Sequence, residues 1–323
     1  MDGRVITAIL VVVGVPAILL GYIVLTERIV GLVPARRQAS VRPWLWLAPG
    51  LLLVLAFLVL PTLATFVASL YNKTGKIFFG VNNYAYFFSS GDTLIALRNS
   101  LIWLVLLTAF VVIGGMLTAV LFDRVRYEVV AKALIFLPLA ISFVGAGVIW
   151  NFMFDYEPPG TTQIGTLNGI LQTFGLDPVA FLQHPLGNSI WLIIVAAWIW
   201  TGFAMVILSA ALKGISPELL EAARVDGATE TQLFRNITLP LLMPTIAVVA
   251  TTMVITALKA FDVVYVMTNG NYDTDILALQ MYHQLFDFGQ PGRASAVAIV
   301  LVVLIIPMMV INIRRFRIQE AIR

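Results

Sequence analysis

Two ionisable side chains lie inside an apolar segment of the sequence, where a charge is costly. Lys259 and Asp262 are three residues apart within the segment 240–266, and Tyr265 follows three residues later. In a helix this spacing keeps the three side chains on about one face, and ionisable groups within a membrane span usually face a cavity or one another. Asp262 could accept hydrogen bonds from a solute, Lys259 could donate them, and Tyr265 could stack on a ring. The alternative is that Lys259 and Asp262 simply pair and hold the helix near its outer end.

Other polar and aromatic residues in or near the apolar segments are weaker candidates for a solute path. Tryptophans and hydroxyls could supply a ring platform and hydrogen bonds, but aromatic residues in spans are more often packing or interfacial residues. Residues near the outer ends of the later segments could border a gate, although loop or interface structure is the simpler interpretation. These candidates are Asn151, Trp198, Trp200, Thr201, Gln280, Tyr282 and Ser295.

Several catalytic chemistries lack the residues that they require. The chain has no cysteine, and its two histidines, His184 and His283, lie in different predicted loops, so we expect no metal site. The fragment nearest to a phosphate-binding loop, Gly75-Lys76-Ile77, lacks the first glycine and the final hydroxyl, so we expect the chain to bind no ATP itself. No serine lies in a nucleophile-elbow motif, and no recurring basic and aromatic face indicates nucleic-acid binding. We therefore predict that the chain is not an enzyme.

The composition predicts an all-α membrane protein. Of the 323 residues, 60% are hydrophobic and only 11% are charged, whereas a soluble domain has about 25% charged residues. A spanning helix needs about 20 apolar residues, and we expect prolines and glycines such as Pro138 and Gly115 to mark kinks and close helix contacts within spans. About seven segments qualify as spans: 5–25, 44–69, 99–122, 131–154, 189–212, 240–266 and 294–313.

The distribution of basic residues predicts the orientation in the membrane. Cytoplasmic loops carry an excess of Lys and Arg. With the N-terminus outside, 14 of the 20 basic residues fall on the inner side and five fall outside. The C-terminus and the loop at 213–239 are then cytoplasmic. The first segment could instead be a signal peptide, but its apolar core is long and no small-residue cleavage site follows it, which favours a retained span.

The cytoplasmic loop at 213–239 carries more helix signals than a connection between two spans requires. Ser216 can cap a helix, and Pro217 suits its first position. Gly227 offers a position where this helix can stop and the chain can turn. These local signals predict a short helix on the membrane surface.

A second short helix is predicted directly after this turn. Thr229 and Gln232 have the spacing of a capping box, which opens a helix. We expect that helix to end near Pro240, because the residue before a proline is disfavoured in the helical conformation. Two short helices joined at a glycine indicate a docking element, although a capped loop that only connects two spans is the plainer alternative.

The residues of this loop also form a longer spaced pattern. Glu221-Ala222-Ala223, then Gly227, and then Ile237 with Leu239-Pro240 resemble the EAA loop of permeases from ATP-binding-cassette (ABC) importers, including the nine residues between Gly227 and Ile237. The resemblance implies that the loop couples to a dimer of cytoplasmic ATPase subunits, which bind the ATP and Mg. The implied coupling residues are Leu219, Leu220, Glu221, Ala222, Ala223, Asp226, Gly227, Phe234, Ile237, Leu239 and Pro240.

Stretches outside the loop narrow the resemblance. Phe79–Tyr84, Leu137-Pro138 with Ile149-Trp150, and Met267–Gly270 resemble the MalF-like half of carbohydrate importers of the maltose and α-glucoside type, although Asn271-Tyr272 stands where Gly-Pro is common. The resemblance implies a heterodimer with a MalG-like second permease in the lipid bilayer and an extracytoplasmic solute-binding protein outside. It also implies that the segment 240–266 lines the sugar path.

The resemblance implies a type I importer permease with an extra N-terminal helix. The helix and a basic cytoplasmic linker would occupy 1–43, and the permease body 44–323, with a core at about 95–313. Such a subunit would move an oligosaccharide, for example an α-glucoside, across the inner membrane of a bacterium or archaeon by alternating access. The alternatives are a permease for another solute such as glycerol-phosphate or an amino acid, a secondary transporter, and a membrane scaffold without transport.

Overall fold

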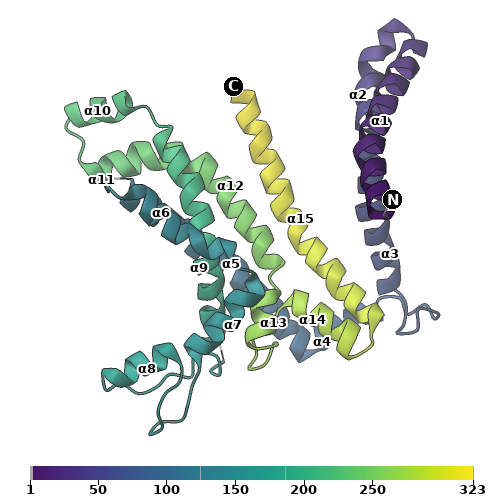
Figure 1. Cartoon of the computed structure of the whole chain (residues 1–323). Helices are drawn as coiled ribbons and strands as arrows, with labels where there is room; N and C mark the ends of the chain where they lie inside the picture. Colours follow the sequence, from purple (N-terminus) through teal and green to yellow (C-terminus); the bar gives the residue numbers. More distant parts are fainter. Residues whose placement is uncertain (1–2, 124, 186, 323) are drawn as a thin grey trace. The chain divides into compact units, whose positions relative to one another are not determined.

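The computed structural model describes residues 3–123, 125–185 and 187–322. The chain divides into two compact units, Met1–Ala64 and Thr65–Arg323. Both units are helical (Figure 1), and over the described residues the only β-type pairing is one antiparallel bridge between Tyr71 and Phe78.

The first unit is built from two long helices joined by a short connection. Helix α1 (Gly3–Leu32) is followed after two residues by α2 (Ala35–Val54), which continues through a π-helical turn (Leu55–Val59) into α3 (Leu60–Ser69). The carboxylate of Glu27 on α1 pairs with the Arg42 guanidinium on α2 at 2.5 Å. The stretch 26–43, expected as a basic linker, is helical except at Val33 and Pro34.

The second unit contains the remaining helices, with two further π-helical turns and one 3₁₀ turn. Its elements are α4 (Asn82–Ser89), α5 (Gly91–Phe122), α6 (Glu128–Phe136), a 3₁₀ turn (Leu137–Ala140), α7 (Phe143–Phe154), α8 (Thr166–Thr173), α9 (Gly187–Lys213), α10 (Pro217–Val225), α11 (Glu230–Leu233), a π turn (Phe234–Thr238), α12 (Leu239–Leu258), α13 (Asp262–Met267), α14 (Leu277–Tyr282), a π turn (His283–Asp287) and α15 (Pro291–Ile322).

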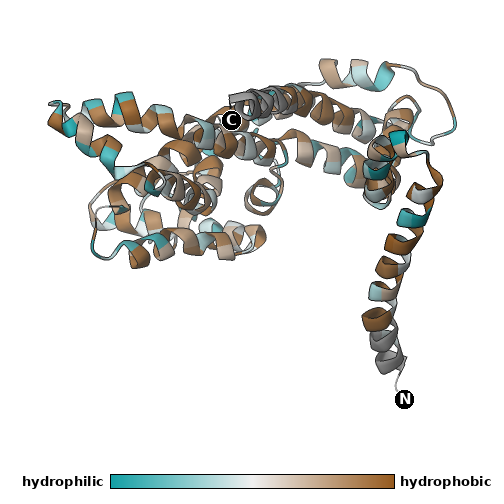
Figure 2. Ribbon diagram, turned by 90° about the horizontal axis from the view of Figure 1, so that it is seen from above, coloured by the Kyte–Doolittle hydropathy of each residue, from teal (hydrophilic) through white to brown (hydrophobic). Residues whose placement is uncertain are grey.

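The long helices agree with the predicted membrane class. Within the described residues, five helices are long and apolar enough to cross a membrane, or six if the bent pair α6–α7 is one span. The seventh predicted segment, 294–313, falls on α15, whose shorter apolar part is Pro291–Pro307. In Figure 2 the long helices are coloured mainly as hydrophobic.

The prediction that Pro138 marks only a kink within one span is wrong. Helix α6 ends at Phe136, and the segments Glu128–Ala140 and Phe143–Phe154 are bent by 102°. Proline has no N–H to continue the helical ladder. After the 3₁₀ turn that contains Pro138, Ile141 is extended and Ser142 caps α7, accepting a hydrogen bond at its Oγ from the N–H of Gly145 at 3.0 Å.

The predicted segment 240–266 is also not one continuous helix. Helix α12 ends at Leu258, and α13 begins at Asp262. The N–H of Lys259 is shared between the carbonyls of Ile255 and Thr256 at 3.3 and 3.2 Å, so the last turn tightens before the chain leaves the helix. The expectation that Lys259, Asp262 and Tyr265 share one helical face is therefore wrong.

The opposite error concerns Pro240, where a helix end was predicted. The chain is instead helical from Glu230 to Leu258 without a break. The N–H of Leu239 bonds to the carbonyl of Phe234, five residues earlier, and this wider turn absorbs the proline that would clash in a regular α-helix. The second short helix predicted in the loop at 213–239 and the following span are therefore one helix.

The core of the second unit depends on close approach between helices at two glycines of α5 and α9. A Cβ on Gly115 of α5 would lie 2.5 Å from the Cβ of Ala204 on α9. A Cβ on Gly202 of α9 would lie 2.5 Å from the carbonyl oxygen of Ile135 on α6. The prediction of a close helix contact at Gly115 is confirmed.

Replacing Gly202 with alanine is therefore expected to destabilise the protein by about 1–3 kcal/mol, because the new methyl group meets backbone that cannot move aside. Helix propensity alone favours alanine over glycine by about 1 kcal/mol. Gly187 at the start of the same helix has no atom within 4 Å of an added Cβ, so Gly187→Ala is the matched control. Thermal unfolding of the detergent-purified protein should show a lower midpoint for Gly202→Ala only, and equal midpoints would contradict the packing argument.

Candidate functional site

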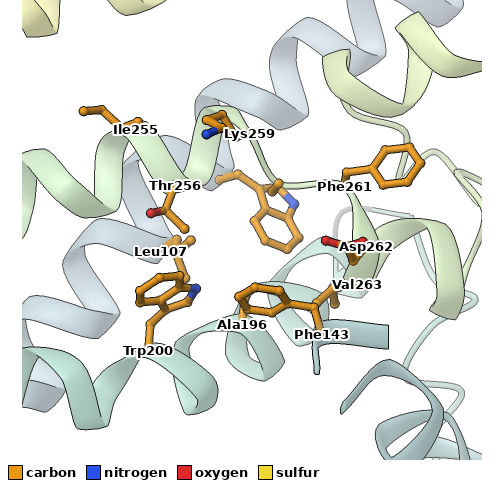
Figure 3. A pocket seen from close by; sticks show the side chains of 12 residues that line it. Leu107, Phe143, Ala196, Trp200, Ile255, Thr256, Lys259, Phe261, Asp262 and Val263 are labelled. Atoms are coloured by element: carbon orange, nitrogen blue, oxygen red, sulfur yellow. The ribbon is translucent and has the colours of Figure 1, made fainter. Parts of the chain in front are cut away.

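A cavity of about 300 Å³ lies where four long helical elements of the second unit meet (Figure 3). We call it the Lys259 cavity. Helices α5, α7, α9 and the end of α12 contribute to its wall, and the break before α13 closes one side. Its lining residues are Trp103, Leu107, Phe143, Ala196, Trp200, Ile255, Thr256, Lys259, Ala260, Phe261, Asp262 and Val263.

The break in the helix places both ionisable residues on this cavity. Lys259 caps the end of α12 and is exposed in the single chain, while Asp262 opens α13 and is half-buried. Figure 3 shows the two side chains on different sides of the cavity. Among the ion pairs of the described residues there is none between Lys259 and Asp262. The structure therefore does not contain the direct pairing that was the alternative interpretation.

Aromatic rings form the other walls. The rings of Phe143 and Trp200 stack at 6.0 Å between centroids, and Trp200 also meets Phe203 edge-on at 5.6 Å. Trp103 is 1% exposed, and in the described part of the chain its indole N–H has no hydrogen-bond partner. The cavity thus combines an apolar, aromatic wall with a few polar groups, which is typical of small-molecule sites.

Sequence reasoning found only part of this lining. Of the predicted residues, the structure brings Lys259, Asp262 and Trp200 together. Sequence reasoning missed Thr256, which lies three residues before Lys259 and could have been found by helical spacing. It also missed Trp103 and Phe143, which come from other helices and have no local signal that points to the cavity.

Tyr265, predicted to stack on a solute ring, and Tyr282, predicted to border a gate, are not among the lining residues of the cavity and lie in an aromatic cluster. The rings of Tyr265 and Phe261 stack at 5.2 Å and 14° between planes. Tyr282 contacts Tyr265 edge-on at 5.4 Å, and it also packs on Phe286 at 4.8 Å. The predicted stacking surface of Tyr265 is therefore partly covered by protein rings.

The other predicted solute-path residues make structural contacts elsewhere. Asn151 donates to the carbonyl of Val266 at 3.2 Å, and the hydroxyl of Thr201 donates to the carbonyl of Ala197 at 2.6 Å. Trp198 packs edge-on against Trp150. Ser295 is half-buried on α15, and Gln280 lines a different cavity.

A second candidate site is the segment 213–239, where the chain turns sharply between α10 and α11. The N–H of Ala228 bonds to the carbonyl of Ala223 at 3.0 Å, and the N–H of Gly227 to that of Arg224 at 3.0 Å. These two bonds define a Schellman motif, with Gly227 at φ +86° in the left-handed position that favours glycine. The predicted helix stop at Gly227 is confirmed.

Two further interactions fix the turn, which we call the elbow (residues 217–233). Thr229 and Gln232 form the predicted capping box at the start of α11. The guanidinium of Arg224 on α10 pairs with the carboxylate of Glu230 on α11 at 2.8 Å, across the glycine. The elbow is thus held by backbone, capping and ionic contacts at once.

The structure divides the implied coupling residues between two faces. Leu220 and Phe234 turn inward and line a cavity of about 490 Å³ together with residues of α5 and α9. Leu219 is 46% exposed and Val225 is 87% exposed, and Glu221 beside them is exposed as well. An outward apolar and acidic surface therefore remains available for a partner.

The rest of the implied coupling residues follow the same division. Ala222 and Asp226 are exposed on α10 and at its end, and Ala223 is half-buried. Ile237 and Leu239 are half-buried, and Pro240 is exposed, on the helix that leads from the elbow into α12.

Comparison with known proteins gives consistent matches over most of the chain. The family model for the binding-protein-dependent transport system inner membrane component matches residues 111–320. The osmoprotective compounds uptake permease protein GgtC of Synechocystis is 48% identical over 86% of this chain and 100% of its own length. The α-glucoside transport system permease protein AglF of Rhizobium meliloti is 44% identical over 85% of this chain and 82% of its own.

A solved structure matches the same architecture. A chain of a bacterial ABC transporter involved in the import of the acidic polysaccharide alginate superposes with a TM-score of 0.73 at 26% identity. The match covers 88% of this chain and 98% of that chain. A chain of a bacterial alginate ABC transporter in complex with an alginate pentasaccharide-bound periplasmic protein matches equally, with a TM-score of 0.73 at 26% identity over 85% of this chain and 94% of that chain.

Proposed function

Because the chain belongs to the binding-protein-dependent transport system inner membrane component family, we propose that it is the permease subunit of an ATP-driven importer for a carbohydrate. Its fold is that of a type I ABC importer permease. We propose an α-glucoside or a similar small glycoside as the solute. The curated relatives include permeases named for α-glucosides and for osmoprotective compounds.

The chemistry of the Lys259 cavity carries this proposal. Aromatic rings such as Phe143 and Trp200 offer flat apolar surfaces to the C–H faces of a sugar ring. Asp262 can accept hydrogen bonds from hydroxyls, Lys259 can donate them, and Thr256 can do both. A neutral, hydroxyl-rich solute can use both Lys259 and Asp262, whereas an anion such as glycerol-phosphate would be attracted by Lys259 but repelled by Asp262.

The chain would act within a larger assembly in the inner membrane. We propose a MalG-like second permease beside it, a solute-binding protein outside, and an ATPase dimer that holds ATP and Mg inside. The proposed orientation has the N-terminus outside and the C-terminus in the cytoplasm. ATP hydrolysis would occur on the ATPase subunits. This chain would contribute the path for the solute and the surface that contacts the ATPase.

The elbow is the proposed contact with the ATPase. Its exposed face, with Leu219, Glu221 and Val225, would seat on the ATPase, and its rigid turn would pass the movement to the spans. Free energy reaches the solute path only if the ATPase binds the two conformations of the permease with different affinity. Alternating access of the Lys259 cavity would follow from that difference.

Uptake by the reconstituted importer tests this function. Proteoliposomes containing both permeases and the ATPase, with ATP inside and the solute-binding protein outside, should accumulate a radiolabelled α-glucoside. A hydrolysis-deficient ATPase serves as the control and should abolish accumulation. Uptake that continues without the ATPase would identify a secondary transporter, and accumulation of glycerol-phosphate in place of glycosides would contradict the proposed solute class.

A further inference from the structure

The connection between α1 and α2 in the first unit carries a cluster of arginines. Every charged residue between positions 5 and 72 falls within 27–42, and the apolar stretches on both sides contain none. These residues are Glu27, Arg28, Arg36, Arg37 and Arg42. We call residues 27–42 the basic tip, because they form the end of the first unit at which its two helices join (Figure 1).

The basic tip has a defined local structure. Helix α1 continues to Leu32 and α2 begins at Ala35, so all four arginines lie on helices. Between the helices, the side-chain amide of Gln38 donates to the carbonyl of Val33 at 2.9 Å, which fixes the turn. The arginines are therefore attached to an ordered backbone within a few helical turns of one another.

Ion pairing within the tip leaves three of the arginines without a counter-charge. The carboxylate of Glu27, the only acidic residue of the tip, pairs with the Arg42 guanidinium at 2.5 Å. Arg28, Arg36 and Arg37 are exposed, and none of the ion pairs among the described residues involves them. Four arginines and one glutamate give the tip a net charge of +3.

The neighbouring residues place the tip at the depth of lipid headgroups. A charge in the hydrocarbon of a bilayer is costly, so Glu27 and Arg42 mark the ends of the two apolar stretches. Residues 27–32 extend α1 by about 9 Å beyond that edge, and a headgroup layer is about 5–8 Å thick. Trp44 and Trp46 are 68% and 41% exposed next to the tip, and tryptophans are enriched at this interface.

A lipid phosphate suits this cluster for two reasons. A guanidinium binds phosphate oxygens through paired N–H donors, and clusters of about four to eight basic residues beside the inner end of a spanning helix are typical of contacts with anionic lipids. The acyl chains of the same lipid would also lie along the apolar stretches 5–26 and 43–64. A free anion in water gains only the first of these contacts.

We propose that the basic tip binds the headgroup of an anionic phospholipid in the inner leaflet of the membrane. The lipid would neutralise Arg28, Arg36 and Arg37 and would fix the depth of the first unit in the bilayer. This inference goes beyond the proposed function and takes from it only the orientation, with the N-terminus outside. It does not depend on the identity of the solute.

The test measures which lipid contacts the tip in the assembled importer. The importer is reconstituted in phosphatidylcholine nanodiscs that contain a small fraction of photoactivatable phosphatidylglycerol, or of phosphatidylcholine with the same reactive chain. After irradiation, the label on residues 27–46 is quantified by mass spectrometry. Phosphatidylglycerol should label this segment far more strongly, and high salt should reduce its preference because exposed charges are screened.

Two sets of variants should change this preference in opposite directions. Each basic residue near an anionic membrane surface contributes about fivefold to the affinity. Arg36→Gln combined with Arg37→Gln should therefore lower the preference by about 25-fold. Glu27→Gln should raise it by about fivefold, because this change releases Arg42 from its ion pair.

The matched control removes the same charge from another exposed turn. Lys73 and Lys76 are exposed in the second unit, and Lys73→Gln combined with Lys76→Gln should leave the preference unchanged. Purifying every variant as the assembled importer excludes chains whose topology has inverted after the loss of basic residues.

Several outcomes would overturn the proposal. One is equal labelling by the two lipids, and another is a preference that the double glutamine change at Arg36 and Arg37 leaves intact. Inorganic phosphate that abolishes the labelling, where chloride at the same ionic strength does not, would identify a free phosphate as the ligand. Labelling of the isolated chain but not of the assembled importer would show that a protein partner covers the tip. Failure of the proposed function is distinguishable, because the labelling requires neither ATP nor solute.

Discussion

Replacing Gly227 with proline is expected to abolish ATP hydrolysis that is stimulated by the loaded solute-binding protein, and uptake with it. Proline is fixed near φ −65° and has no N–H, whereas Gly227 lies at φ +86° and donates to the carbonyl of Arg224. The Schellman motif cannot form, and the contact between Arg224 and Glu230 across the turn is lost with it. A proline in an incompatible position costs about 3 kcal/mol or more, which the short α10 cannot offset.

Two controls separate a specific effect on the elbow from a general loss of stability or assembly. An added Cβ at Gly227 meets no atom within 4 Å, so Gly227→Asn, which tolerates this conformation and keeps the N–H, should retain most of the coupling. Gly160 also has a positive φ, +92°, with no atom within 4 Å, and it lies in the predicted outer loop. Gly160→Pro should leave coupling intact. Wild-type stimulation in a correctly inserted Gly227→Pro complex would refute the role of the elbow.

Removing the carboxylate of Asp262 is expected to reduce the uptake rate by about 10- to 100-fold, because a hydrogen bond to a charged group contributes about 1.5–3 kcal/mol. Asp262→Ala should have this effect at saturating solute-binding protein, where capture outside no longer limits the rate. Uptake into proteoliposomes, normalised to the amount of assembled complex, is the measurement.

The competing explanation is that Asp262 only stabilises the start of α13, where an acidic residue in the first turn is favourable by about 0.3–1 kcal/mol. Asp262→Ser keeps a small polar side chain at the first helical position but not the charge, so the midpoint of thermal unfolding, measured for both variants, shows how much of any loss comes from a weaker helix start. Ser295→Ala, which changes a residue outside the cavity, should stay within about twofold of wild type. Normal uptake by Asp262→Ala, or full recovery in Asp262→Ser, would remove Asp262 from the solute path.

Local signals predicted those parts of the structure that short-range chemistry determines. The capping box at Thr229 and Gln232 and the stop at Gly227 depend on residues within one or two turns, so the sequence contains the whole cause. The close packing at Gly115 was similarly readable, because a small residue in an apolar span has few other uses.

The predictions were wrong where distant packing or a change in helix type determines where a helix ends or which residues meet. No proline or glycine lies between Ile255 and Asp262, so no local residue predicts that α12 ends at Leu258. At Pro240 the local signal was present, but a π-helical turn over Phe234–Thr238 overrode it. The Lys259 cavity needs Trp103 from α5 and Phe143 from α7, whose approach depends on the tertiary fold.

The uninterrupted helix from Glu230 to Leu258 has a geometric consequence of its own. Its 29 residues correspond to about 44 Å at the rise of an α-helix. Glu230, the ion-pair partner of Arg224, lies at one end, and Lys259 lies just beyond the other. Along this helix the relative azimuth of the two ends depends on the residue count, at about 100° for each α-helical residue, and on the wider π-helical turn at Phe234–Thr238. Its length is therefore as constrained as its chemistry, since one inserted residue would swing Lys259 by more than a quarter turn without altering any side chain at either end.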